Sequence, residues 1–277
     1  MKGFIGEALG TFILTMFGCG AVAVSVLYGA HVGLMQVALV WGVGVMLAIY
    51  VTRHLSCAHL NPAVSVGMVV SGRMAARKLP MYLVAQLLGA IVAGFAIYAL
   101  FNPSIVAFEA ANNIVRGSAE SVITAKMFGE FYPNPAGGGV EAVVSMPLAM
   151  FVECFGTFLL VLFIFALTED CNAGRPNDNS VPVLIGLTVT SLICLTAPLT
   201  QTGINPARDF GPRLVSWMMG WGDAAFPGTP GSGGFFWVYI LAPIVGGILA
   251  AFTFTRIVEP IMKSKSPSCD CGNGDKK

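Results

Sequence analysis

Charged residues are scarce in this sequence of 277 residues. They make up 10% of the chain, whereas soluble globular domains carry about 25%. Hydrophobic residues make up 56%, and the mean hydropathy is +0.78. A formal net charge of +1 gives no general basic surface for nucleic acid. The composition therefore excludes an ordinary soluble domain and indicates a membrane protein.

Histidine is also rare, and no catalytic constellation is visible. The three histidines, His31, His54 and His59, all fall at expected loop positions. A membrane enzyme would need a nucleophile, a base or a metal cluster in one cavity, and these residues do not build one. We therefore expect neither an enzyme nor a resident metal or cofactor.

The seven cysteines form no recognisable framework. Four of them lie in apolar surroundings and read as buried thiols, namely Cys19, Cys57, Cys154 and Cys194. Cys269 and Cys271 lie on a polar tail, where two ligands do not make a zinc site. The sequence predicts no disulfide scaffold.

Long apolar runs predict an all-α membrane protein with six transmembrane helices. The runs cover residues 4–28, 34–53, 80–101, 147–168, 181–198 and 235–258. Residues 102–145 are expected to form a long polar loop, and the tail from Glu259 is expected to be disordered.

Lys and Arg placement predicts the orientation. With a cytoplasmic N-terminus, eleven of the 15 Lys and Arg residues fall on the cytoplasmic side. Because cytoplasmic loops carry an excess of these residues, we expect both termini in the cytoplasm. The expected location is the inner or plasma membrane of the cell, crossed several times.

One tripeptide occurs twice, as Asn61-Pro62-Ala63 and Asn205-Pro206-Ala207. Asn is a strong N-cap and Pro suits the first helical position, so each copy can begin a helix. The segment after the first copy is long enough for about 15 Å of helix, half of the roughly 30 Å hydrocarbon core. Two such half-helices, entering from opposite faces, would meet with their positive dipole ends at the midplane. This convergence would repel cations and predicts a pore.

The two halves of the chain resemble each other. Glu7 and Glu153 each begin an apolar segment containing Gly-Thr-Phe at the same spacing, 146 positions apart, and the two Asn-Pro-Ala copies are 144 apart. With three spans in each half, this is an inverted 3+3 repeat whose site lies where the halves meet. The predicted division is a first repeat at 1–105, an extracellular or periplasmic connecting loop at 106–145, a second repeat at 146–258 and a cytoplasmic tail at 259–277.

The segments around both tripeptides resemble the two signature loops of the major intrinsic proteins, the aquaporins and aquaglyceroporins. They read Ser-Cys-Ala-His-Leu-Asn-Pro-Ala-Val at 56–64 and Gly-Ile-Asn-Pro-Ala-Arg-Asp-Phe-Gly-Pro at 203–212. The resemblance covers roughly residues 3–258 and implies a passive channel, assembled as a homotetramer in the lipid bilayer with one pore per subunit.

The resemblance also assigns roles to individual residues. Asn61 and Asn205 would donate their free side-chain amides into the lumen, and Arg208 would belong to the selectivity constriction. Glu7 and Glu153 would accept hydrogen bonds from loop backbone amides, and Asp209 would be a further support. The backbone carbonyls expected to line the lumen are those of Cys57, Ala58, His59, Thr202, Gly203 and Ile204.

Trp41 indicates the solute, because the second helix of aquaglyceroporins has Trp at the constriction. An indole face opposite an arginine suits a solute with a carbon backbone on one side and hydroxyls on the other. Ile193 stands where water-selective relatives tend to place His, but Thr202 stands where glycerol facilitators carry Phe. The set Trp41, Ile193, Thr202 and Arg208 therefore favours glycerol, and leaves water alone, urea, ammonia, small polyols and neutral metalloid hydroxides open.

An ion-coupled secondary transporter is the rival of a different class, since it too has inverted repeats and broken helices. Such a transporter normally needs acidic or cationic groups at mid-membrane for its coupling ion. The groups predicted to converge here are the neutral amides of Asn61 and Asn205. Ion coupling is therefore disfavoured.

Overall fold

The computed structural model describes residues 1–31, 33–135, 143–228 and 233–264, and within them the chain is helical with no strand. Six helices are long and apolar enough to cross a membrane. They are α1 (Lys2–Tyr28), α2 (Leu34–Ser56), α4 (Leu79–Ala111), α6 (Met146–Thr168), α7 (Val181–Thr200) and a composite sixth made of η5 (Phe236–Leu241), α9 (Ala242–Thr253), η6 (Phe254–Val258) and α10 (Glu259–Ser264). This confirms the six predicted spans, apart from the end of the third.

Two half-helices complete the fold, α3 (Pro62–Val70) and α8 (Pro206–Ser216). The remaining short elements are η1 (Ala76–Lys78), η2 (Ala119–Ser121), α5 (Val122–Ala125), η3 (Trp217–Trp221) and η4 (Gly222–Ala225). Both half-helices begin directly after the asparagine of an Asn-Pro-Ala copy, as predicted.

Three predicted details were wrong. The third span extends beyond Phe101 to Ala111, because apolar side chains continue past Pro103 and Ile105 is fully buried. The predicted polar loop is therefore helical at its start, and it contains η2 and α5 as well. The tail begins with α10 instead of irregular chain. Cys57, which was expected to be a buried thiol, is exposed.

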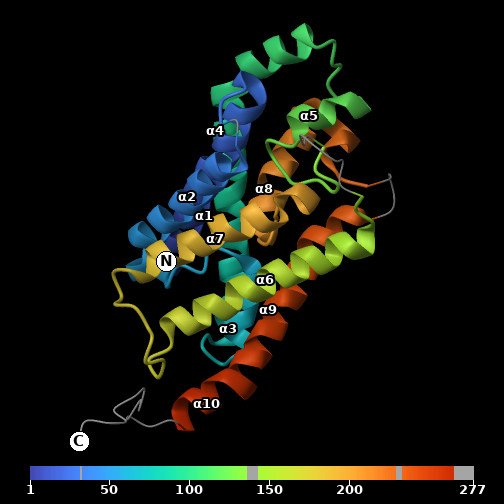
Figure 1. The fold of residues 1–277 in the computed structure, drawn as a ribbon. Coiled ribbons are helices and arrows are strands. Elements are labelled where there is room, and N and C mark those ends of the chain that lie inside the picture. The colour runs from blue at the N-terminus through green and yellow to red at the C-terminus, as the bar shows by residue number, and fades with distance from the viewer. Residues whose placement is uncertain (32, 136–142, 229–232, 265–277) are drawn as a thin grey trace, which may run out of the picture.

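The helices pack so that each half-helix rests on the other half of the chain (Figure 1). Helix α1 packs against α2 and α4, and α6 packs against α7 and α9. Helix α3 lies against α9, whereas α8 lies against α4. Each half-helix thus contacts the last span of the opposite repeat. This exchange brings the two Asn-Pro-Ala copies together in the middle of the bundle.

Glycines allow the helices to come into close contact at equivalent places in both halves of the chain. A Cβ atom on Gly89 of α4 would lie 2.1 Å from the carbonyl oxygen of Ala8 in α1. A Cβ on Gly246 of α9 would lie 2.1 Å from the carbonyl oxygen of Cys154 in α6. Ala8 and Cys154 directly follow the repeat residues Glu7 and Glu153. Small residues allow backbones to approach in this way in membrane helices.

We expect Gly89→Ala to destabilise the folded protein by about 1–3 kcal/mol, because backbone atoms must move apart to admit the methyl group. The matched control is Gly20→Ala, where the added Cβ would meet its nearest neighbour, Ile97 Cδ1, at 3.6 Å. Thermal unfolding of both variants in the same detergent measures the difference. Equal unfolding temperatures would show that α1 and α4 can accommodate a methyl group at position 89 without cost.

Candidate functional site

The first turns of α3 and α8 meet through their capping asparagines. The Asn61 side-chain oxygen accepts from the N–H of Ala63 at 2.8 Å, and that of Asn205 accepts from Ala207 and Arg208 at 3.2 Å. Each amide group also donates to the opposite loop. Asn61 Nδ2 donates to the Ile204 carbonyl and Asn205 Nδ2 to the Leu60 carbonyl, both at 2.8 Å.

These cross-connections modify the predicted role of the two amides. The sequence suggested that both amide groups are free. In the structure, one N–H of each amide donates to a carbonyl of the opposite loop. An amide nitrogen carries two N–H groups, so the second can donate to a molecule in the lumen. Both asparagines line the central cavity.

Buried carboxylates hold the two re-entrant loops. Glu7 accepts from the backbone N–H of His59 at 3.0 Å and of Leu60 at 2.7 Å. Glu153 accepts from the N–H of Gly203 at 2.8 Å and of Ile204 at 2.6 Å. Neither side chain is exposed. The two halves therefore fix their loops with the same chemistry.

Left-handed backbone conformations occur in both re-entrant loops. Positive φ angles occur in the first loop at Cys57 (72°), Ala58 (52°) and Leu60 (54°), and in the second at Gln201 (59°), Thr202 (69°) and Ile204 (41°). Such conformations are costly for residues other than glycine and persist only where the surroundings determine them. The hydrogen bonds from the loop N–H groups to Glu7 and Glu153 hold the two loops in these conformations.

Sequence reasoning missed a second pair of supports. Tyr82 donates its hydroxyl to the carbonyl of Ser56, and Tyr239 donates to the carbonyl of Thr200 at 3.0 Å. Both carbonyls end the helix that leads into a re-entrant loop. The signal was present in the sequence, because each tyrosine precedes its close-packing glycine, Gly89 or Gly246, by seven positions.

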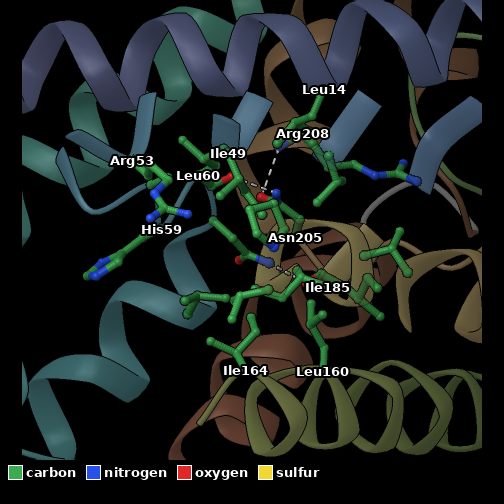
Figure 2. A pocket seen from close by; sticks show the side chains of 18 of the residues that line it. Leu14, Ile49, Arg53, His59, Leu60, Leu160, Ile164, Ile185, Asn205 and Arg208 are labelled. Atoms are coloured by element: carbon green, nitrogen blue, oxygen red, sulfur yellow. Dashed lines mark hydrogen bonds between the residues drawn. The ribbon is translucent and has the colours of Figure 1, made fainter. Parts of the chain in front are cut away.

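A cavity of about 250 Å³ lies inside the bundle and is lined by both halves of the chain (Figure 2). Ile164 and Leu160 lie on one side, and Arg53 and His59 approach from another. The predicted site residues along it are Trp41, Cys57, Ala58, His59, Asn61, Ile193, Thr202, Gly203, Ile204, Asn205 and Arg208. Pro62, Ala63, Pro206, Ala207, Glu7, Glu153 and Asp209 are not part of this lining. The Arg53 end also carries Arg175 and Asp178.

The predicted filter residues Trp41, Ile193, Thr202 and Arg208 all line the cavity, and Arg208 contacts both Trp41 and Thr202. The guanidinium carbon of Arg208 lies 4.0 Å from the centroid of the Trp41 ring, and Arg208 Nη2 donates to the Thr202 carbonyl at 3.1 Å. The Thr202 hydroxyl is paired with that of Thr196 at 2.8 Å. Ile193 adds an apolar wall. The filter therefore presents an indole and an alkyl surface together with a cation and a carbonyl.

Glu130, which sequence reasoning missed, completes the filter from the connecting segment. Its carboxylate forms an ion pair with Arg208, and each side chain is 5% exposed. Its backbone N–H donates to Asp209 at 2.7 Å, and Arg213 donates to its carbonyl at 2.6 Å. Since Glu130 lies in a polar segment without a repeating pattern, no sequence signal marked it.

Asp209 and Arg213 form a buried ion pair behind the filter. Arg213 Nη2 lies 2.8 Å from Asp209 Oδ1, and neither side chain is exposed. The guanidinium also lies 5.1 Å from the ring centroid of Phe235 and 5.2 Å from that of Phe131. Asp209 thus links α8 to the connecting segment, which extends its expected supporting role.

The remaining polar candidates do not form a chemical centre. The His59 ring lies 3.2 Å from the Ser65 hydroxyl and tilts against Tyr82, with a centroid distance of 5.0 Å, so it braces its loop. Across the described residues, no group of three or more His, Cys, Asp or Glu side chains could hold a metal ion. Cys269 and Cys271 lie outside these residues.

Comparisons with known proteins point in one direction. The family model described as "Major intrinsic protein" matches residues 1–254. The chain is 42% identical over 250 residues to a glycerol uptake facilitator protein of Pseudomonas aeruginosa, covering 89% of this chain and 85% of that protein. It is 40% identical over 254 residues to the glycerol uptake facilitator protein of Escherichia coli, covering 92% and 87%.

Two further similarities extend this set. A propanediol uptake facilitator of Citrobacter freundii is 38% identical over 254 residues, with 92% of this chain and 91% of that protein covered. Among solved structures, the aquaglyceroporin from Plasmodium falciparum matches with a TM-score of 0.80 and 28% identity, covering 95% of this chain and 98% of that one.

Proposed function

Since the chain belongs to the major intrinsic protein family, we propose that it is a passive transmembrane channel for glycerol and other small uncharged solutes. The observation that carries the proposal is the filter, in which Arg208 faces Trp41 in a cavity that both capping asparagines also line. The names of the similar uptake facilitators support the choice of glycerol.

The filter chemistry matches a polyol. The carbon side of glycerol can lie on the Trp41 indole and the Ile193 side chain, which are apolar. Its hydroxyl groups can accept from Arg208 and donate to the Thr202 carbonyl. Further along, the free N–H groups of the asparagines and the loop carbonyls repeat this pairing of donors and acceptors. A dehydrated hydroxyl group thus finds partners along the lumen, which offsets the cost of leaving water.

The same geometry supports exclusion of ions. The N-termini of α3 and α8 converge on the lumen with their partial positive charges, and Arg208 adds a full charge. Glu7 and Glu153, which could bind a coupling cation, instead accept backbone hydrogen bonds behind the loops. This arrangement argues against an ion-coupled transporter.

A water-selective channel is the second candidate, and two observations favour it. Arg208 contacts the face of Trp41, so the filter in this structure is narrow. Thr202 also lacks the aromatic surface expected in a glycerol filter. Water would pass such a filter more readily than glycerol.

Several assembly features belong to the proposal. Large apolar side chains such as Phe151 (64% exposed) and Leu195 (63% exposed) face outward from the spans, where lipid or other subunits would cover them. We propose a homotetramer in the cell membrane with cytoplasmic termini. The two-repeat division at 1–105 and 146–258 is part of the same proposal.

Glycerol entry into proteoliposomes tests whether transport is passive. The initial rate should be the same with no ion gradient, with a sodium gradient and with a proton gradient. It should also scale with the glycerol gradient alone. Accumulation of glycerol above the outside concentration, driven by either ion gradient, would instead identify a coupled transporter.

Trp41→Ala is expected to relax solute size selection. The substitution removes the indole wall of the filter and the contact with Arg208, so polyols larger than glycerol should enter. We expect the ratio of five-carbon polyol to glycerol permeability to rise by tenfold or more, corresponding to about 1.4 kcal/mol. Light scattering by proteoliposomes in each solute measures it. Tyr28→Ala, at the exposed end of α1, is the control and should leave the ratio unchanged.

A further inference from the structure

Glu130 is paired with the filter arginine in this structure. Arg208 uses Nη1 for Glu130 and Nη2 for the Thr202 carbonyl, so both ends of the guanidinium are engaged. The side chains of Glu130 and Arg208 are each 5% exposed, which leaves water little access to weaken their pairing. The carboxylate therefore acts directly on the group that faces the solute.

The backbone of Glu130 is itself fixed to α8. Its N–H donates to Asp209, and its carbonyl accepts from Arg213. Nearby, the N–H of Phe131 donates to Gln201 at 2.9 Å. The segment is thus held on both sides of Glu130, so the ionisation of one side chain can act on Arg208 while the segment stays in place.

The paired arginine narrows the filter. Carbon atoms in contact are about 3.5–4.0 Å apart, so nothing fits between the Arg208 guanidinium and the Trp41 ring when they are separated by 4.0 Å. The cavity reaches these filter residues, and its lining includes no residue of the described connecting segment 112–135. Glycerol that lies on the Trp41 indole and accepts from Arg208, as in the proposed function, therefore needs Arg208 to move off Trp41.

We propose that Glu130 determines which solutes the filter admits. When ionised, Glu130 holds Arg208 against Trp41 and the filter favours the smallest solutes, such as water. When neutral, it releases Arg208, and the filter admits polyols the size of glycerol. This inference rests on the proposed channel function and adds a pH-sensitive determinant of selectivity to it.

The direction of the pH effect follows from burial. Burial raises the pKa of the Glu130 carboxyl to about 7, against the opposing influence of the Arg208 guanidinium. Glu130 is therefore neutral below that pH and ionised above it, so glycerol permeability should rise as the outer pH falls. The charged and titratable groups around it are Arg208, Asp209 and Arg213 of α8, Lys126 of its own segment, Cys19 of α1 and Tyr239 of η5.

Lys126 limits the useful pH range. Burial lowers the pKa of its ammonium group to about 8, so alkaline conditions would change a second charge. Between pH 5.5 and 7.5 Lys126 stays mostly charged. For a group with a pKa near 7, the neutral fraction falls about fourfold across this range.

The experiment measures water and glycerol permeability of full-length channels in proteoliposomes at outer pH 5.5 and 7.5. We expect the glycerol-to-water ratio of the wild type to be about fourfold higher at pH 5.5, in proportion to the neutral fraction. Glu130→Gln keeps the shape and removes the charge, so its ratio should be independent of pH and at least as high as the acid value of the wild type. Glu120→Gln, at an exposed glutamate of the same connecting segment, should behave as the wild type.

Each alternative result has a definite meaning. Equal wild-type ratios at both pH values, or a Glu130→Gln ratio that changes with pH as the wild type does, would overturn the role of Glu130. The wild-type pH profile decides the matter even if Glu130→Gln fails to insert. Water flux without glycerol flux in any channel at either pH would instead contradict the proposed glycerol function.

Discussion

Replacing Arg213 with methionine should destabilise the folded channel by about 3–5 kcal/mol, because it leaves Asp209 as a buried carboxylate without its partner. Both side chains of this pair are fully buried. The carbonyls of Glu130 and Ala225 would lose their guanidinium donors as well. Since these contacts join α8 to the connecting segment, the loss affects the filter and the fold together.

Unfolding in detergent, followed by a tertiary-structure signal against temperature, measures this effect. Arg175→Met is the matched control, because its partners Asp170 and Asp178 have side chains that are 86% and 64% exposed. Surface ion pairs contribute about 0–1 kcal/mol, so this variant should unfold close to the wild type. Similar losses in both variants would contradict the account of the buried pair.

Replacing Glu153 with alanine should abolish conduction through otherwise assembled channels. The N–H groups of Gly203 and Ile204 and the hydroxyl of Thr200 would lose their acceptor inside the bundle. Each buried donor left without a partner costs about 1–3 kcal/mol. Because the positive φ angles of this loop depend on these bonds, the Thr202 and Gly203 carbonyls would no longer hold their places along the lumen.

Glycerol flux divided by the amount of folded protein in the membrane separates this effect from poor expression. Glu153→Gln keeps one oxygen acceptor and should retain part of the flux. Glu120→Ala removes an exposed glutamate and should retain all of it. Normal flux per channel in Glu153→Ala would show that the second loop holds its shape without the carboxylate.

The fold was predictable because its strongest signals are local. Apolar runs long enough to cross a bilayer marked the six spans, and each Asn-Pro-Ala copy marked the start of a half-helix. The two Asn-Pro-Ala copies are 144 positions apart and Glu7 and Glu153 are 146 apart, and this near-equality marked the repeat. The first two patterns act within one segment, where hydropathy and capping decide the structure, and the third needs only a comparison of two such segments.

The filter was less predictable because it depends on contacts between distant segments. Trp41 and Arg208 could be named by resemblance, but their direct stacking could not. Glu130 reaches Arg208 across 78 positions from a segment with no periodic pattern. The span ending at Ala111 was underestimated because residues 102–145 were assigned to a polar loop, whereas packing around the buried Ile105 sustains the helix beyond Phe101.

Stopped-flow light scattering tests the central claim most directly. One sample of vesicles containing the wild-type channel is mixed with an impermeant osmolyte, and the rate of shrinkage measures water flux. A second sample is mixed with glycerol at an outer pH of 5.5, and the rate of reswelling measures glycerol flux. The account predicts reswelling in glycerol far faster than in empty vesicles, as expected for a filter built from Trp41 and Arg208. Fast shrinkage with reswelling no faster than in empty vesicles would contradict it and identify a water channel.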